Sequence, residues 1–254
     1  MWSTLRTKAT LIVRRIDCQT IEFWPSMSVR TDLWKAIKSG HATTVRRSLR
    51  KRPELVETTD PHGFTPLMRA VMECDRSILV IDAILAAGAQ VNRQTDEGYT
   101  ALHCAIDVSG QANENSDEVI GRLIAAGADL TLRQHYGSTP LLLAVVEGTG
   151  TEVNALLARG ANPNEVMPLD TLPDFNGGRM TLMGAITSPD AEMVFSALLK
   201  AGADPMSRDA HGATFFDYAE MVDRELGDPT PENANFREKV RRCVGIVREH
   251  MRNT

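Results

Sequence analysis

The chain lacks the marks of a membrane protein and of a disulfide-stabilised secreted domain. No apolar run in its 254 residues approaches the roughly eighteen residues that a membrane-spanning helix requires. Its four cysteines, at positions 18, 74, 104 and 243, show neither paired metal-ligand spacing nor a disulfide framework. We therefore expect no membrane insertion, and a reducing cytosol is the simplest setting, which predicts a cytoplasmic protein.

Common catalytic signatures are also missing. The sequence contains no Gly-x-x-x-x-Gly-Lys-Ser/Thr phosphate loop, no Gly-x-Ser-x-Gly elbow and no His-Glu-x-x-His helix. Its six histidines each fall singly in an expected turn, helix or terminal segment. We expect a protein that is not an enzyme and that has neither cofactor nor metal; a metal- or nucleotide-dependent enzyme is the hypothesis that the sequence supports least.

Charge is unevenly distributed along the chain. Residues 1–60 contain 12 Lys and Arg against 6 Asp and Glu, a balance of +6, so the remainder carries −11 within a total of −5. Much of the positive charge lies in residues 46–52, which hold four arginines and one lysine. This segment is interpreted either as the solvated outer face of a terminal repeat or as a patch for nucleic acid or another anionic surface.

One stretch recurs along the chain. It reads GFTPLMRA at 63–70, GYTALHCA at 98–105 and GSTPLLLA at 137–144, with weaker copies GRMTLMGA at 178–185 and GATFFDYA at 212–219. The aligned apolar residue falls at 33, 67, 102, 141, 182 and 216, in steps of 34, 35, 39, 41 and 34. Thr before Pro suits a helix N-cap followed by the first helical residue, whose missing N–H needs no partner there.

A second mark recurs in phase with the first. LAAGA at 85–89, IAAGAD at 124–129, LARGAN at 157–162 and LKAGAD at 199–204 each end an apolar helical run with Gly. Glycine at this place suits a left-handed C-terminal cap, where a side chain would be strained. Two marks in phase, at steps near roughly 33 residues, resemble the ankyrin-repeat family from residue 31 to about 250.

The resemblance implies an all-α ankyrin solenoid of about six helix-turn-helix units joined by hairpin-like loops. We expect units at about 31–59, 60–94, 95–133, 134–176, 177–207 and 208–254, the last with a C-terminal cap, after a flexible or partly ordered leader at 1–30. Whether residues 1–26 belong to the native protein stays open, because Met27 precedes the first repeat. His103 occupies a family position that implies a structural hydrogen bond.

Two insertions interrupt the repeat. A polar, acidic segment at 107–118 separates the two helices of the third unit, and the spacing from Gly160 to Gly178 is 18 residues, where other copies have 10. The second insertion contains apolar residues, among them Val166, Met167 and Phe175, as well as two prolines. It is either a preorganised anchor for a partner or a loop that folds back on its own repeats.

Function is therefore expected at the surface. The family binds other proteins with its hairpin tips and the exposed face of its first helices, which implies a partner protein, possessing a basic surface, that this chain inhibits or neutralises. A bacterial toxin-immunity role fits this hypothesis; the alternative is a scaffold or regulator that binds nucleic acid or an anionic surface through the basic first repeat. The predicted partner-binding residues are His62, Phe64, Met72, Glu73, Asp96, Glu97, Tyr99, Asp107, His135, Tyr136, Val146, Glu147, Met167, Asp170, Asp174 and Phe175.

Overall fold

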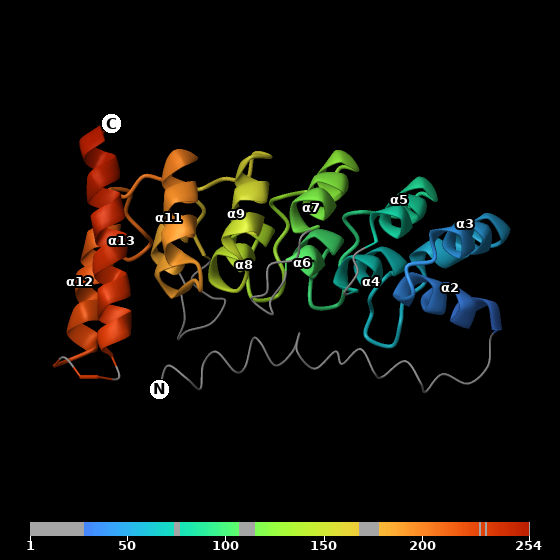
Figure 1. The fold of residues 1–254 in the computed structure, drawn as a ribbon, viewed down its shortest axis with the longest axis horizontal. Coiled ribbons are helices and arrows are strands. Elements are labelled where there is room, and N and C mark those ends of the chain that lie inside the picture. The colour runs from blue at the N-terminus through green and yellow to red at the C-terminus, as the bar shows by residue number, and fades with distance from the viewer. Residues whose placement is uncertain are drawn as a thin grey trace. The chain divides into compact units, whose positions relative to one another are not determined.

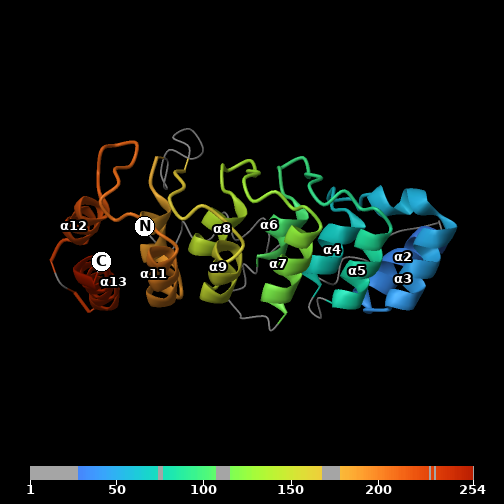
Figure 2. The same cartoon turned by 90° about the horizontal axis from the view of Figure 1, so that it is seen from above.

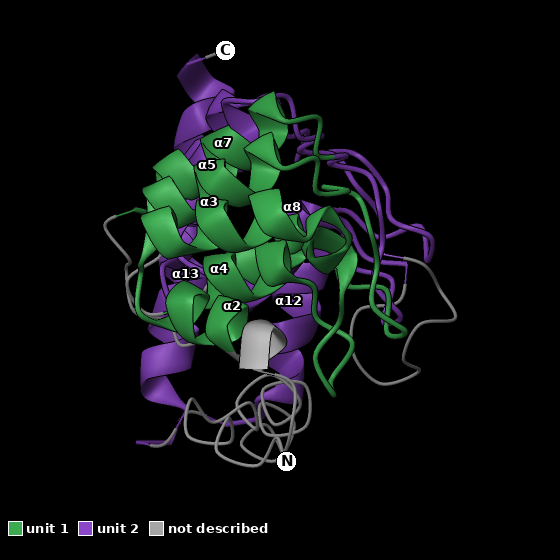
Figure 3. Ribbon diagram, turned by 90° about the vertical axis from the view of Figure 1, so that its right-hand side faces the viewer, with its two compact units in different colours: residues 1–128 green, residues 129–254 purple. Residues whose placement is uncertain are grey.

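The computed structural model describes residues 28–73, 77–106, 115–167, 178–228, 230–231 and 233–253. Within these ranges the chain forms twelve α-helices and two 3-10 helices, and its extended pairing is limited to an isolated bridge. The chain forms two compact units, residues 1–128 and residues 129–254, which Figure 3 colours separately. The expected leader lies outside the described residues up to position 27, and the first described helix already begins at Ser28.

The described residues of unit 1 form three helix pairs. They are α2 (Ser28–Lys38) with α3 (Ala42–Lys51), α4 (Pro66–Met72) with α5 (Ile78–Ala86), and α6 (Ala101–Ala105) with α7 (Ser116–Ala125). A 3-10 helix, η2 (Pro53–Glu57), follows α3. The first helices α2, α4 and α6 pack against one another in one row, and the second helices α3, α5 and α7 form the other row (Figure 1).

Unit 2 repeats this two-row arrangement. Its pairs are α8 (Pro140–Val146) with α9 (Gly150–Leu157), α10 (Thr181–Gly184) with α11 (Ala191–Lys200), and α12 (Phe215–Glu225) with α13 (Ala234–Asn253). The short α10 continues into the 3-10 helix η3 (Ala185–Thr187). Within this unit α8, α10 and α12 pack in sequence, as do α9, α11 and α13, and the described parts of the hairpins that join successive pairs project to one side of the helices (Figure 2).

An equivalent leucine is buried in four first helices. Leu67, Leu102, Leu141 and Leu182 are each the second residue of their helix and are at most 3 % exposed. Burying such a side chain stabilises a fold by about 1.5–3 kcal/mol relative to leaving it in water. The predicted equivalence of these positions is confirmed, and with it the all-α repeat fold.

Threonine caps start the first helices as expected. The Thr65, Thr100 and Thr139 side chains accept hydrogen bonds from the N–H of the third helical residue at 3.2–3.3 Å. The His103 Nδ1 atom lies 2.9 Å from Thr100 Oγ1, and the His103 ring is buried. The structural role predicted for His103 is therefore confirmed.

An aspartate organises the hairpin turns before α4 and α12. Asp60 Oδ1 accepts from the N–H groups of His62 and Phe64, and Asp209 makes the same two contacts in the last repeat. Such bonds satisfy backbone donors that have no partner in a helix or sheet, and they fix the shape of the tip. These hydrogen bonds consequently define the backbone conformation of these two tips.

The fifth repeat departs from this pattern, as its sequence indicates. Helix α10 begins after Met180, which provides no side-chain cap. Thr181 is instead the first helical residue, and both its N–H and its hydroxyl donate to the Glu165 carbonyl oxygen, at 3.0 Å in each case. The loop that precedes α10 thus provides the hydrogen-bond acceptor at the start of this helix. Helix α10 spans only four residues and continues into the 3-10 helix η3.

None of the helices in the described ranges combines the length and the apolar character needed to cross a lipid bilayer. The longest, α13, has Val240, Cys243 and Val247 on its buried face and many charged residues elsewhere. This amphipathic pattern matches the predicted C-terminal cap of the repeat array.

Two glycines of unit 2 provide a test of whether the Gly that follows a second helix is needed for its left-handed backbone conformation. Gly160 has φ +94°, whereas Gly245 lies inside α13, and a Cβ added at either position meets nothing within 4 Å. We expect Gly160→Ala to destabilise the fold by about 1–2 kcal/mol through left-handed strain. We expect Gly245→Ala to stabilise it by up to about 1 kcal/mol through helix propensity. Urea denaturation measures both, and equal signs would contradict the cap assignment.

Candidate functional site

The hairpin tip before α6 offers unpaired charge beside an aromatic ring. Asp96 and Glu97 are exposed, and neither carboxylate has an ion-pair partner among the described residues. Tyr99 is half-buried, with its ring edge-to-face against His103 at a centroid separation of 6.0 Å. A fixed aromatic ring next to free carboxylates suits contact with a partner protein.

The preceding hairpin, before α4, exposes fewer of its predicted contact residues than expected. His62 is exposed at its tip, and Met72 and Glu73 are half-buried at the end of α4. Phe64 is only 7 % exposed, because the ring packs into unit 1 with the Arg69 guanidinium 5.1 Å from its centroid. We therefore leave Phe64 out of the proposed surface and treat it as a packing residue.

The first hairpin of unit 2 carries the predicted His135 and Tyr136. His135 is exposed and Tyr136 half-buried, and their rings meet edge-to-face at 5.7 Å. The tip is shaped by Gln134, which accepts from the Tyr136 N–H, and by Arg133, which donates to the Gly137 carbonyl oxygen. Both rings are thus held on a hydrogen-bonded turn.

The base of the long insertion is an antiparallel pairing. Val166 bridges Met180, the Met167 N–H donates to the Arg179 carbonyl oxygen at 2.9 Å, and the Gly178 N–H donates to the Met167 carbonyl oxygen at 2.7 Å. Met167 is thereby fixed in place. The predicted residues Asp107, Asp170, Asp174 and Phe175 lie outside the described part of the chain.

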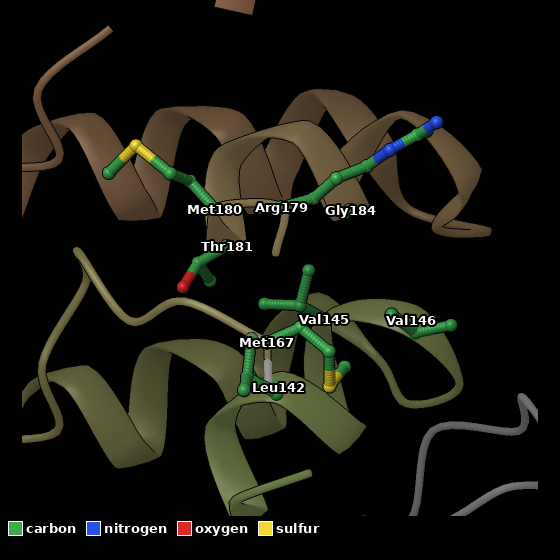
Figure 4. A pocket seen from close by; sticks show the side chains of 8 residues that line it. All are labelled: Leu142, Val145, Val146, Met167, Arg179, Met180, Thr181 and Gly184. Atoms are coloured by element: carbon green, nitrogen blue, oxygen red, sulfur yellow. The ribbon is translucent and has the colours of Figure 1, made fainter. Parts of the chain in front are cut away.

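This pairing brings two predicted residues together in a small apolar pocket, which we call the α8–α10 pocket. Val146 and Met167 face it, with Glu147 half-buried next along the chain. Figure 4 shows its side chains, with the Arg179 guanidinium and the Met180 thioether extending in opposite directions. The pocket is lined by Leu142, Val145, Val146, Met167, Arg179, Met180, Thr181 and Gly184.

A missing side chain opens the pocket. Gly184 occupies the repeat position filled elsewhere by Arg69, Cys104, Leu143 and Tyr218. A Cβ built on Gly184 would lie 3.6 Å from Val146 Cγ2 and 3.8 Å from Val145 Cγ1, which is ordinary van der Waals contact. The space beside α8 therefore exists because repeat 5 has glycine where the other repeats have a side chain.

Arg179 is held in a defined position at this pocket. Its guanidinium carbon lies 4.1 Å from the centroid of the buried Tyr218 ring. Burial raises the pKa of Tyr218, while the Arg179 charge and its hydrogen bond act in the opposite direction, so the phenol stays neutral near pH 7. No carboxylate of the described residues lies within ion-pair distance of Arg179. The stacked guanidinium therefore keeps its capacity to bind an anion.

Glu165 braces the loop that carries Met167. The Thr139 hydroxyl donates to its Oε2 atom at 2.6 Å, and an Arg133 nitrogen lies 3.8 Å from the same oxygen. Burial raises the pKa of the Glu165 carboxyl above its ordinary 4.5, while Thr139 and Arg133 act in the opposite direction. Glu165 thus links the first hairpin of unit 2 to the insertion at some electrostatic cost.

The second helix of repeat 1 carries a separate basic face. Arg46, Arg47, Arg50 and Lys51 are exposed on α3, opposite the buried Val45 and Leu49, and Arg52 follows them. None of these cations forms an ion pair with a described carboxylate. A solvated outer face of a terminal repeat and a site for a polyanion are both consistent with this arrangement.

No group of three or more His, Cys, Asp or Glu side chains within the described ranges is arranged to hold a metal ion. Cys104 and Cys243 are free thiols, and burial raises their pKa to about 12 and about 11 respectively. Protonated thiols are poor nucleophiles and poor metal ligands, so neither is suited to such chemistry near pH 7.

Family models agree with the stacked helix pairs. The model for ankyrin repeats in three copies matches residues 33–113, and the model for a single ankyrin repeat matches residues 97–134. The chain carries ankyrin repeats, and its fold class is that of an all-α ankyrin-repeat protein. Ankyrin repeats mediate protein–protein interaction, and the fold is generally a non-catalytic interaction module.

Curated relatives share these repeats as part of longer proteins. The chain is 30% identical over 171 residues to the glycerophosphocholine phosphodiesterase gde1 of Schizosaccharomyces pombe, covering 65% of this chain and 14% of that protein. It is 31% identical over 169 residues to the fem-1 homolog A-like protein of Mus musculus, covering 64% and 23%. The chain thus spans less than a quarter of the length of these two relatives.

Solved structures show the same fold. An ankyrin repeat domain from Acinetobacter baumannii superposes with a TM-score of 0.60 at 24% identity, covering 83% of this chain and 96% of that one. A chain in the structure of a predatory endopeptidase from Bdellovibrio bacteriovorus in complex with an immunity protein superposes with a TM-score of 0.56 at 22% identity, covering 83% and 97%. At these identities the likeness shows the fold alone.

Val145 and Gly184, which α8 and α10 supply to the pocket, were not predicted from the sequence. One signal was available, because Gly184 is the only glycine at its position among the five aligned copies. A glycine inside a predicted helix often marks close packing or open space. The space beside Gly184 is bounded by Val145 and Val146 of the preceding repeat. An alignment of the repeat motifs does not show that these residues are neighbours.

Glu165 generates a pH-dependent prediction. Because its pKa is raised in the folded state, protonation of Glu165 stabilises the fold below about pH 4.5, and that stabilisation is lost as the pH rises through the folded pKa. Glu165→Gln keeps an acceptor for Thr139 without the buried charge. We expect the free energy of unfolding of Glu165→Gln, relative to the unaltered protein, to rise between about pH 4 and pH 7.

Urea denaturation at both pH values measures this difference, with Glu97→Gln at an exposed carboxylate as the control for the amide substitution itself. A difference for Glu165→Gln that stays constant or falls with rising pH would contradict the assignment of burial as the dominant effect.

Proposed function

We propose that this protein binds one specific partner protein through its hairpin tips and the exposed sides of its first helices. The observation that carries the proposal is the repeated presentation of rings on hydrogen-bonded turns, with Tyr99 beside free carboxylates in unit 1 and Tyr136 beside His135 in unit 2. Aromatic side chains fixed in one geometry lose little entropy on binding and are common energetic centres of interfaces.

The free carboxylates of unit 1 favour a basic region on this partner. Asp96 and Glu97 extend from the tip without an ion-pair partner among the described residues, so a Lys or Arg of the partner meets no internal competitor there. Such charges chiefly raise the association rate and select the partner, because exposed ion pairs contribute only about 0–1 kcal/mol each.

We further propose that binding inhibits or neutralises the partner. A rigid, non-catalytic surface acts on a partner by covering it, and steric cover of an active site is sufficient for inhibition. The similarity of fold to a chain from an endopeptidase–immunity protein complex supports an immunity role as the specific form of this proposal.

Affinity capture from the source cells tests the proposal. The unaltered protein and the double variant Tyr99→Ala with Tyr136→Ala serve as paired baits, and quantitative mass spectrometry compares the recovered proteins. We expect one partner whose recovery falls at least tenfold with the double variant, since truncating two interface aromatics commonly costs more than about 2 kcal/mol. Purified, that partner should lose activity when the unaltered protein is added.

The matched control replaces Glu220 and Arg224, an exposed i,i+4 pair on α12, with alanine. It should retain the partner, and thermal unfolding should show that all baits are folded. Equal recovery of every protein by the Tyr double variant, the control and the unaltered chain would overturn the proposed surface.

The basic face of α3 supports a second candidate function, binding of a nucleic acid or an anionic surface. Its four exposed cations and Arg52 lack carboxylate partners in the described chain. If they bind phosphates, log affinity for DNA, RNA or anionic vesicles falls steeply with log salt, by about 0.9 per neutralised phosphate for duplex DNA. Arg46→Glu with Arg50→Glu should abolish this binding while Arg224→Glu leaves it intact, and salt-independent or absent binding by the unaltered protein removes this candidate.

A further inference from the structure

We propose that the basic face of α3 binds the phosphodiester backbone of a double-stranded nucleic acid, by charge alone and without reading base sequence. This inference rests on the second candidate function and commits it to one class of polyanion. It is independent of the protein partner expected at the hairpin tips. The basic face consists of Arg46, Arg47, Arg50, Lys51 and Arg52.

The charge of α3 is of one sign. Its ten residues hold four cations and no carboxylate, and none of these cations lies within ion-pair distance of a described Asp or Glu. Among the carboxylates of the same repeat, Glu57 pairs with Arg93 of the next repeat. Asp32 and Glu54 form no ion pair within the described ranges. No described carboxylate therefore competes with a polyanion for the basic face.

Solubility of a terminal repeat does not require this pattern, as the other terminal helix of the array shows. Helix α13 also carries an excess of cations, six against two carboxylates, yet half of these cations are compensated. The compensating ion pairs are Arg237 with Asp223 at 2.5 Å, Arg241 with Glu238 at 3.9 Å and Arg242 with Glu192 at 3.1 Å. A solvated outer face thus mixes both signs on α13, whereas α3 does not.

The cations of α3 also oppose its own stability. They lie four residues apart in two rows, Arg46 with Arg50 and Arg47 with Lys51. Like charges at this spacing destabilise a helix slightly. The negative end of the helix dipole favours cations in the last turn but gives no reason for Arg46 and Arg47, which lie one turn earlier. A local rule that is broken without a structural gain indicates a functional surface.

The face lacks the side chains on which other anionic partners depend. None of the exposed large apolar residues of the described chain belongs to α2 or α3, so nothing here inserts into a bilayer or forms the apolar centre of a protein interface. The one aromatic residue of these two helices, Trp34, is buried and unavailable to stack on the bases of a single strand. A double helix needs neither contact, because cations that neutralise its phosphates release condensed counterions.

The geometry of α3 suits two strands. At 3.6 residues per turn its two rows of cations diverge by about 100° around the helix axis. Long side chains that diverge in this way reach phosphates on both strands that border a groove, whereas a flat lipid surface meets one row at a time. Helix α3 packs on α2, α5 and η2, and these neighbours keep it from entering a groove deeply enough to read base edges (Figure 1).

Fluorescence anisotropy of labelled duplexes of about 20 base pairs, titrated with the full chain, tests the inference. DNA and RNA duplexes of two unrelated sequences are compared, and a DNA single strand, phosphatidylserine vesicles and a glutamate decapeptide compete as unlabelled probes. We expect the same Kd for both sequences, about 10–100 μM near 0.15 M salt, with log affinity falling by about 3–4 per tenfold rise in salt. The three competitors should bind at least fivefold more weakly. Binding of either duplex supports the inference, and the tighter one identifies the polymer.

Charge-neutralising variants locate the binding surface. Arg46→Gln with Arg50→Gln, and separately Arg47→Gln with Lys51→Gln, should each lower duplex affinity at least tenfold and reduce the salt slope by about 2. Fold stability in urea should hold or rise, because a like-charge pair is removed. The matched control is Arg248→Gln with Arg252→Gln, which removes two exposed cations at the same spacing from α13 and should leave the affinity within about twofold.

Three results would overturn the inference. They are equal losses in the control and the α3 variants, duplex binding that does not change with salt, and tighter binding of the single strand, the vesicles or the peptide.

Its failure is distinguishable from failure of the proposed functions. If no anionic probe binds, the inference and the second candidate function are both wrong, and the protein partner at Tyr99 and Tyr136 is unaffected. If vesicles or the single strand bind through α3 more tightly than the duplexes, the inference is wrong and the second candidate function stands.

Discussion

The structure depends on the contact that each helix pair makes with the next. A first helix of four to eleven residues, such as α10 or α12, is too short to persist alone in water, and its pair buries too little surface to fold by itself. Leu67 and Leu102 in unit 1, and Leu141 and Leu182 in unit 2, leave water only because a neighbouring pair covers them. Cohesion is therefore local, and each unit tolerates insertions wherever they leave this row of contacts intact.

That tolerance has a structural consequence in unit 2. The insertion lengthens the hairpin before α10. At the base of this hairpin Val166 forms a β-bridge with Met180. Helix α10 has no N-cap side chain, and the Thr181 hydroxyl donates instead to the Glu165 carbonyl oxygen. The same repeat carries Gly184, which leaves the α8–α10 pocket open. The repeat that departs most from the common pattern is thus the one beside which this small pocket forms.

Much of the fold could be predicted because its signals are local. A Thr cap and a left-handed Gly each act on the end of their own helix, so their residues recur in the sequence of the repeats. Thr100 caps its helix and Gly88 has a positive φ, as expected. The site was less predictable. Phe64 shares its repeat position with Tyr99, yet its ring is buried beneath Arg69, a side chain that the third repeat replaces with Cys104. The pocket likewise arises from Gly184 meeting Val145 across a repeat boundary, a relation that a motif alignment does not display.

The central claim is that successive helix pairs form the scaffold and that their hairpin tips form the contact surface. Hydrogen–deuterium exchange of the protein with and without its captured partner tests this claim most directly. The claim predicts slower exchange on binding at residues 60–64, 95–99 and 134–138, with the second helices α5, α7, α9 and α11 unchanged. Slower exchange confined to those second helices, with the tips unaffected, would contradict it.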